Sequence, residues 1–244
     1  MGLTKYTGPL APPPAWLDPS REAKGWHAPS IPTELFEPYV VDRLLAHGLT
    51  IDQALDVGAN VTSETGWHEE FAYWNCGGVK CTKPWAERYE QRTGRKPSWW
   101  RTHGNAGSGD SRTVFYRAYE SLDDFLTEWL VTFVPKPGTV GQTHLYKRTG
   151  ELFWSGGDWF PALVAAGYKG PVTASKPKAA IDCHASIVRR LTTVWAQARL
   201  RVTVDANWGA KSQHALDDLL GQPGSLTNPR DLHALATLTE PRVI

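Results

Sequence analysis

Two consecutive helical patterns, joined by a short break, constrain the fold of this chain more than any other feature of its sequence. Apolar residues recur at helical spacing over residues 34–47, and Gly48 is placed to end that helix. Thr50 and Gln53 have the spacing of a capping box, in which each side chain bonds the backbone amide of the other residue. A second helix is therefore predicted to begin here, and Gly58 on its apolar face permits close packing against a neighbouring helix.

The second helix is predicted to end at Glu64, which Gly66 and Trp67 follow closely. A carboxyl group that an aromatic ring partly desolvates has a raised pKa and can hold a proton near neutral pH. A general acid in glycoside hydrolysis needs that property. The indole of Trp67 also offers a flat apolar face to a sugar ring. The alternative interpretation is a solvated glutamate at a helix end, beside a tryptophan of the core.

Composition narrows the classes of partner. The 26 Lys and Arg residues nearly balance the 25 Asp and Glu residues, so the overall charge does not favour nucleic acid or an anionic membrane surface. The 12 tryptophans and 18 prolines are many for 244 residues, and exposed aromatic platforms for carbohydrate are one use of such an excess. A tryptophan-rich core is the other.

The cysteines and the N-terminus bear on the compartment. Three cysteines, Cys76, Cys81 and Cys183, are too few and uneven for a disulfide framework, and a local Cys76–Cys81 bridge and two buried thiols both stay open. No His and Cys cluster has the spacing of zinc ligands, so no metal and no cofactor are expected. The N-terminus lacks an apolar run and no later segment suits a membrane span. We therefore expect neither a signal peptide nor membrane insertion.

The chain is predicted to have four parts. These are a proline-rich N-terminal arm over 1–32, a catalytic domain over 33–170, a linker over 171–180 and a small helical domain over 181–244. Within the catalytic domain, residues 68–114 are interpreted as irregular structure that includes a β-hairpin.

Further elements follow that irregular stretch. Residues 113–119 form the best strand candidate, and Ser121 with Asp124 is placed to cap a helix over 122–134. Asp158 is predicted to cap a short helix over 159–166. The predicted fold class is α+β and mainly helical, with a small all-α part at the C-terminus.

Four sequence blocks occur in order in the first region, at residues 64–67, 75–80, 115–122 and 165–168. Together these blocks resemble the glucosaminidase family of bacterial peptidoglycan hydrolases. The second block has glycine where the family's Asn-x-Phe-Gly-Ile-Lys pattern has phenylalanine. The resemblance implies a lysozyme-like fold in which Glu64 is the catalytic acid.

The resemblance also implies roles for other side chains. Glu64 would protonate the oxygen of a β-1,4 bond between amino sugars, and Tyr168 would position water or the sugar, although a structural hydroxyl is the alternative for Tyr168. The side chains expected to contact substrate are Trp67, Asn75, Lys80, Tyr119 and Trp159. The alternative role for Asn75 is to anchor the loop, and the alternative for Lys80 is a solvated side chain without a role in binding.

The second carboxylate of the family is missing from its usual place. The family often carries an acid on a hairpin between the second and third blocks, whereas residues 98–103 of this chain contain none. Asp110 in a glycine-rich loop is the first candidate, followed by Glu87 and Glu90. Without a second acid, the acetamido group of the substrate could assist, as in known exceptions among glycosidases.

Residues 204–216 are similar to the pattern Val-Asp-Gly-x-Trp-Gly-x-x-Thr-x-x-Ala-Leu. Because this pattern is the signature of the three-helix type of peptidoglycan-binding domain, the C-terminal region resembles that domain. Ala206 replaces the glycine, which is unfavourable if the turn needs a positive φ, and Ser212 replaces the threonine but keeps a capping hydroxyl.

These features together predict a monomeric cell-wall glycosidase whose partner is the peptidoglycan glycan strand. The expected origin is a phage endolysin, made in the cytoplasm and released through a holin, or an antibacterial lysin exported by a secretion machine. One alternative is a wall-binding or tail-associated protein with a degenerate lysozyme-like domain. The other is a glycosidase that acts on chitin-like polymers.

Overall fold

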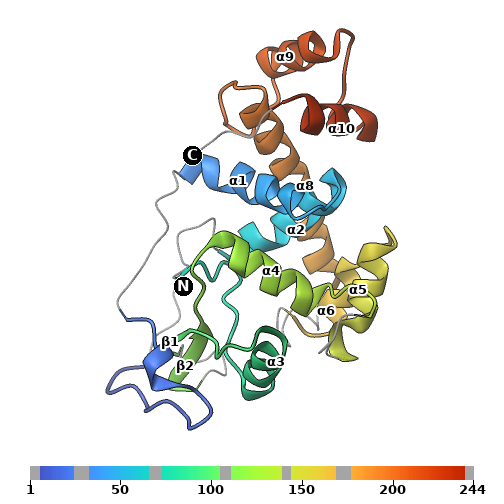
Figure 1. The fold of residues 1–244 in the computed structure, drawn as a ribbon. Coiled ribbons are helices and arrows are strands. Elements are labelled where there is room, and N and C mark those ends of the chain that lie inside the picture. Colours follow the sequence, from blue (N-terminus) through green and yellow to red (C-terminus); the bar gives the residue numbers. More distant parts are fainter. Residues whose placement is uncertain are drawn as a thin grey trace.

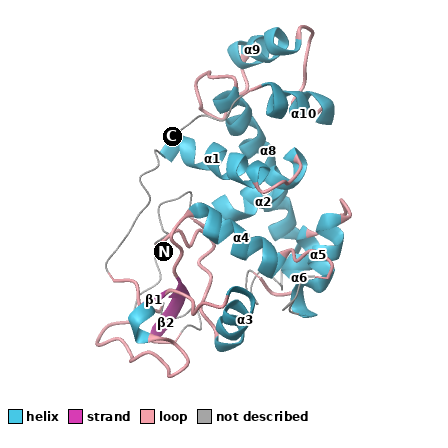
Figure 2. Ribbon diagram, viewed as in Figure 1, coloured by secondary structure: helices cyan, strands magenta, loops and turns pink. Residues whose placement is uncertain are grey.

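The structure is a computed structural model that describes residues 6–24, 33–65, 73–104, 111–138, 144–168 and 177–239. Over these residues it is a mainly helical α+β fold with nine α-helices and one two-stranded antiparallel hairpin. Figure 2 shows the hairpin at one end of the molecule, with helices over the rest. None of the described helices combines the length and the apolar character that a membrane crossing requires.

The first two helices form as their sequence signals predict. Helix α1 spans Thr33–Ala46 and helix α2 spans Ile51–Glu64. Gly48 has a φ of 82° in the break between them, a conformation that glycine adopts without strain. Both hydrogen bonds of the Thr50–Gln53 capping box are present. The capping box therefore fixes where α2 begins, and the helix ends at Glu64.

The stretch expected to be irregular contains a helix as well as the hairpin. Helix α3 spans Lys83–Thr93, and the strands β1 and β2 span Trp99–His103 and Thr113–Arg117. The strands pair antiparallel, with Trp99 opposite Arg117. The expectation of irregular structure missed α3 because that helix buries just Trp85 and Ala86 and is polar on its other faces.

The N-terminal arm lies along the hairpin. Residues 6–24 run beside β1 and β2 (Figure 1), and the amide of Ala23 donates to the carbonyl of Trp99 at 2.8 Å. The indole Nε1 of Trp99 donates to the carbonyl of Asp18 at 2.9 Å. Leu17, Trp85 and Trp99 belong to a small apolar cluster that joins the arm, α3 and the hairpin.

Three helices follow the hairpin. Helix α4 spans Leu122–Phe133, with Ser121 as its N-cap. Helix α5 spans Lys147–Trp154 and α6 spans Phe160–Ala165. The N-cap of α6 is Trp159, without a side-chain capping bond, so the expected Asp158 cap is wrong.

The C-terminal helices continue from the main core. Helix α8 spans Pro177–Arg199, α9 spans Ala210–Leu220 and α10 spans Pro229–Leu238. Residues 177–180, predicted as part of a linker, are the first turn of α8. Helix α8 packs on α1, α2 and α6 and reaches the α9–α10 pair (Figure 1). The main hydrophobic core draws side chains from α1, α2, α4, α5, α6, α8 and α10.

Candidate active site

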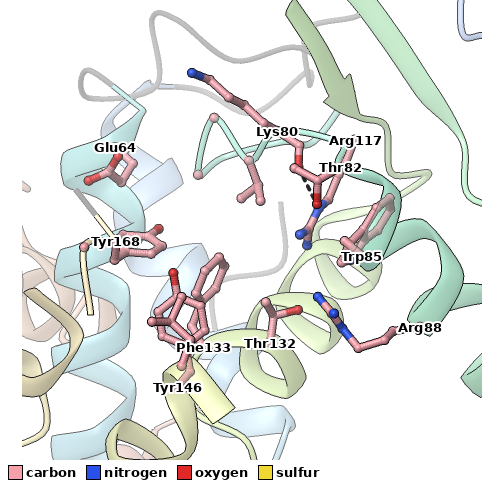
Figure 3. Close-up of a pocket in the computed structure, with 15 residues that line it drawn as sticks. Glu64, Lys80, Thr82, Trp85, Arg88, Arg117, Thr132, Phe133, Tyr146 and Tyr168 are labelled. Atoms are coloured by element: carbon pink, nitrogen blue, oxygen red, sulfur yellow. Dashed lines mark hydrogen bonds between the residues drawn. The ribbon is translucent and has the colours of Figure 1, made fainter. Parts of the chain in front are cut away.

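A cleft of about 570 Å³ lies at the C-terminal end of α2. Glu64 is half-buried on one side of it, and it is the one carboxylate among the described residues that line the cleft. Phe133 and Tyr146 contribute aromatic rings, which pack edge-to-face with centroids 5.0 Å apart. Figure 3 shows Glu64 and Tyr168 on one side, with Trp85, Arg88 and Arg117 on the other.

Tyr168 is held next to Glu64 by two hydrogen bonds from different helices. Asn60 Nδ2 of α2 donates to the Tyr168 hydroxyl at 3.3 Å, and Trp129 Nε1 of α4 donates to it at 3.1 Å. The hydroxyl accepts both bonds, so its own proton is left to be donated to a further group. Burial and then the negative charge of Glu64 hold the pKa of Tyr168 well above its usual range. Tyr168 is therefore a neutral hydroxyl donor at neutral pH.

The opposite side of the cleft carries positive charge and packs against the buried carboxylate of Glu128. The Arg117 guanidinium lies 3.9 Å from the ring centroid of Trp85, and Arg117 Nε donates to the backbone carbonyl of Lys80 at 3.3 Å. Glu128 is buried behind Trp85 and Arg117. It accepts a hydrogen bond of 2.6 Å from Trp85 Nε1 and also forms an ion pair with Arg92. These contacts fix the planes of Trp85 and Arg117 at the edge of the cleft.

The structure brings three of the predicted site residues, Glu64, Lys80 and Tyr168, together around the cleft. Asn75 is buried and anchors the loop, because its Nδ2 donates to the carbonyls of Val79 and Arg117 and its Oδ1 accepts from the amide of Val79. These bonds occupy the amide group that was expected to contact substrate.

Two other expected substrate contacts are in the core. Tyr119 is 9% exposed and packs edge-to-face on Phe125, and Trp159 is 3% exposed and donates its indole N–H to Asp56. Neither lines the cleft, so in this structure neither ring offers a face to a sugar there. Their apolar neighbours in the folded chain, which sequence spacing does not reveal, account for this burial.

The candidates for a second carboxylate are not at the cleft in the part of the chain described. Glu87 and Glu90 are exposed on α3 and do not line it. Asp110 and the expected platform Trp67 lie outside the described residues. The cationic residues Arg88 and Arg117 were missed by sequence reasoning, although Arg117 falls within the third family-like block.

The two buried cysteines are not bridged and do not supply a nucleophile. Cys76 and Cys81 are both free. Burial raises the pKa of Cys81 to about 12 and raises that of Cys76 well above its usual value, so both are thiols at neutral pH. Among the described residues, no group of three or more His, Cys, Asp or Glu side chains is arranged to hold a metal ion.

Comparison of the chain with models of protein families, with curated proteins and with solved structures found no match. The residues of the cleft and their geometry are therefore the basis of the proposed function.

Proposed function

We propose that the protein hydrolyses β-1,4 glycosidic bonds of the peptidoglycan glycan strand, with Glu64 as the general acid. The observation that carries this proposal is the position of Glu64, at the end of α2 and on the side of an open cleft, beside the neutral hydroxyl donor Tyr168. The half-buried ring of Tyr146 gives the same cleft an apolar surface for a sugar ring.

In the proposed reaction, Glu64 protonates the glycosidic oxygen while the bond to the anomeric carbon breaks. Tyr168 holds the attacking water or a sugar hydroxyl through its O–H. The second group is Asp110 or the acetamido oxygen of the substrate, since Glu64 is the single carboxylate among the described residues of the cleft. The stereochemical course depends on that second group and on its distance from Glu64.

The finer architecture is part of the same proposal. The catalytic region would be lysozyme-like, and α8, α9 and α10 would form a peptidoglycan-binding unit. Ala206 has a φ of 58°, which supports the resemblance, because the signature has a glycine at this position. Binding by this unit would raise the local concentration of the catalytic region at the insoluble bacterial cell wall. A monomeric endolysin or exported antibacterial lysin fits this arrangement.

The rival function is wall binding without catalysis, which the single carboxylate of the described cleft favours. Glu64→Gln separates the two, because the amide keeps the shape of the side chain but has no proton to donate to the glycosidic oxygen. We expect wild-type protein to clear suspensions of purified peptidoglycan, and Glu64→Gln to clear them at least about a hundredfold more slowly.

The matched control is Glu87→Gln, which makes the same change on the exposed face of α3, away from the cleft. It should clear peptidoglycan at the wild-type rate. Thermal unfolding of both variants should match the wild type, which shows that the fold is intact. Equal clearance by Glu64→Gln and Glu87→Gln would contradict the proposed role of Glu64.

A further inference from the structure

Arg117 is a buried cation with an unused hydrogen-bond donor at the edge of the cleft. The residue is 5% exposed, and among the described residues its Nη1 has no hydrogen-bond acceptor. Glu128 Oε1 lies 3.7 Å from Nη1, which is an ion pair without a hydrogen bond. A buried donor without an acceptor is costly, and the cost is greater for a charged group. Arg117 also lines the cleft, so its guanidinium group can meet an acceptor that enters the cleft.

Arg88 lines the same part of the cleft, one helical turn beyond Trp85 on α3. It is half-buried, and no hydrogen bond or ion pair joins its guanidinium to another described residue. Figure 3 shows the guanidinium groups of Arg88 and Arg117 directed into the same space in front of Thr132. Burial and the positive charges of Arg117 and Arg92 lower the pKa of Arg88, as expected where positive charge is crowded.

The nearest carboxylate, that of Glu128, does not neutralise the positive charge on this side of the cleft. Glu128 already accepts from Trp85, pairs with Arg92 and accepts from Thr132 Oγ1 at 3.1 Å. The buried carboxylate of Glu128 is thus shared among several guanidinium groups on this side of the cleft. In the described part of the chain, the guanidinium groups of Arg88 and Arg117 have no carboxylate that binds them in a bidentate manner.

We infer that Arg88 and Arg117 form a subsite for a carboxylate of the substrate, on the side of the cleft opposite Glu64. Guanidinium groups match the geometry of carboxylates and bind them through charge-assisted hydrogen bonds. The inference rests on the proposed function and names its substrate class: a glycan whose sugars carry acidic substituents. In peptidoglycan that carboxylate is the lactyl group of muramic acid or a carboxylate of the stem peptide, whereas chitin-like polymers have neither.

The test measures binding without turnover, with full-length Glu64→Gln protein and isothermal titration calorimetry. Three probes separate the sources of the charge. They are the N-acetylglucosaminyl-N-acetylmuramic acid disaccharide with a free lactyl group, the same disaccharide with its stem peptide, and neutral chitobiose. We expect at least one acidic probe to bind about tenfold tighter than chitobiose, with a preference that shrinks as salt is added.

Arg88→Gln in the same background should remove most of that preference, because Arg88 is half-buried and can be changed without emptying the core. Arg95→Gln, an exposed arginine beyond the end of α3, is the matched control and should keep the preference. Tight binding of the lactyl disaccharide assigns the subsite to muramic acid, and tight binding of the peptide form alone assigns it to the stem. Equal affinity for acidic and neutral probes, no binding of any probe, or a preference that survives Arg88→Gln would overturn the inference.

Failure of this inference and failure of the proposed function are distinguishable. Hydrolysis of peptidoglycan by the wild type, without a preference for acidic probes, would remove the subsite and leave the catalytic proposal. A preference for acidic probes without hydrolysis would keep the subsite and indicate a wall-binding protein.

Discussion

At the scale of single residues, the cleft depends on contacts that hold each polar group in one orientation. Tyr168 is fixed by Asn60 and Trp129, and Arg117 is fixed by its position over Trp85. The side chains of Tyr168 and Arg117 are thus held at the cleft by residues that are themselves well packed. This matters because small displacements of positioned groups lower catalytic rates strongly.

Tyr168→Phe removes the hydroxyl and keeps the ring. We expect slower turnover of peptidoglycan, because the group that positions water or sugar is lost. We also expect a loss of about 1–3 kcal/mol in the free energy of unfolding, since Trp129 Nε1 loses its acceptor. Kinetics and urea unfolding measure the two effects. Tyr89→Phe, a tyrosine that does not line the cleft, is the control, and equal turnover by the two variants would argue against a role for Tyr168.

Alkaline pH tests the buried titratable groups. Burial raises the pKa of Tyr168, Tyr119 and Cys81, so the folded state favours their protonated forms. Their contribution is fully present below the unfolded pKa values, 9.0 for cysteine and 10.0 for tyrosine, and is lost as pH rises through the folded values. The free energy of unfolding should therefore fall as pH rises above 9.

Urea unfolding at a series of pH values measures this loss, and tyrosinate absorbance reports the titration. Of the eight tyrosines, Tyr168 and Tyr119 should ionise together with unfolding and not before it. Ionisation of all eight in a chain that is still folded would contradict this account.

At the scale of helices and strands, local signals explain what the sequence could predict. The capping box at Thr50 and the Ser121 cap each begin the helix that was expected. Glu64 could be placed at a helix end because Gly66 follows it closely in the sequence. Helix α5 was missed because its eight residues include Gly150, and glycine is a weak helix former.

The close approach of α5 to the end of α4 gives a packing prediction. A Cβ added at Gly150 would lie 2.1 Å from the carbonyl oxygen of Pro135. Alanine normally favours a helix over glycine by about 1 kcal/mol, so a destabilised Gly150→Ala variant would report the clash and not helix propensity. We expect the free energy of unfolding to fall by about 1–3 kcal/mol, as at other overpacked core sites.

Gly209→Ala is the control, because the added Cβ meets nothing within 4 Å and φ is −105°. Chemical denaturation of both variants measures the difference. A Gly150→Ala variant as stable as Gly209→Ala would show that α5 does not pack on Pro135 as described.

The cationic side of the cleft, formed by Arg88 and Arg117, could not be predicted from local sequence patterns. Arg117 lies on β2 and Arg88 lies on α3, and nothing in the spacing of either residue indicates that the two face one cleft. Their meeting depends on how α3 packs against the hairpin and on the buried carboxylate of Glu128. Contacts of this kind are long-range, and a single sequence does not disclose them.

At the scale of the whole molecule, α8 binds the C-terminal region to the first two helices. Asp42 of α1 accepts from Arg199 Nη2 at 2.7 Å and from Trp195 Nε1 at 2.9 Å, and all three are buried. His184 of α8 also lies 2.7 Å from Asp56 of α2. These contacts join α8 to the scaffold that carries Glu64, so the two regions are mechanically connected.

Asp42→Ala removes the acceptor and leaves Arg199 buried without its carboxylate. We expect the free energy of unfolding to fall by about 3–5 kcal/mol. Denaturation followed by tryptophan fluorescence should show one cooperative transition at a lower denaturant concentration. Glu120→Ala, an exposed acid, should leave the midpoint nearly unchanged. A first transition confined to the C-terminal helices would contradict the coupling.

The central claim is that Glu64 donates a proton to a glycosidic oxygen of peptidoglycan, and mass spectrometry of the released fragments tests it most directly. Purified peptidoglycan incubated with wild-type protein should yield soluble fragments with one kind of new end. A reducing N-acetylglucosamine, a reducing N-acetylmuramic acid or an anhydro end would identify the bond and the course of the reaction. Glu64→Gln protein with wild-type thermal stability should release none above background. Absence of cleaved glycan with the wild type, or the same fragments at the same rate from Glu64→Gln, would contradict the account.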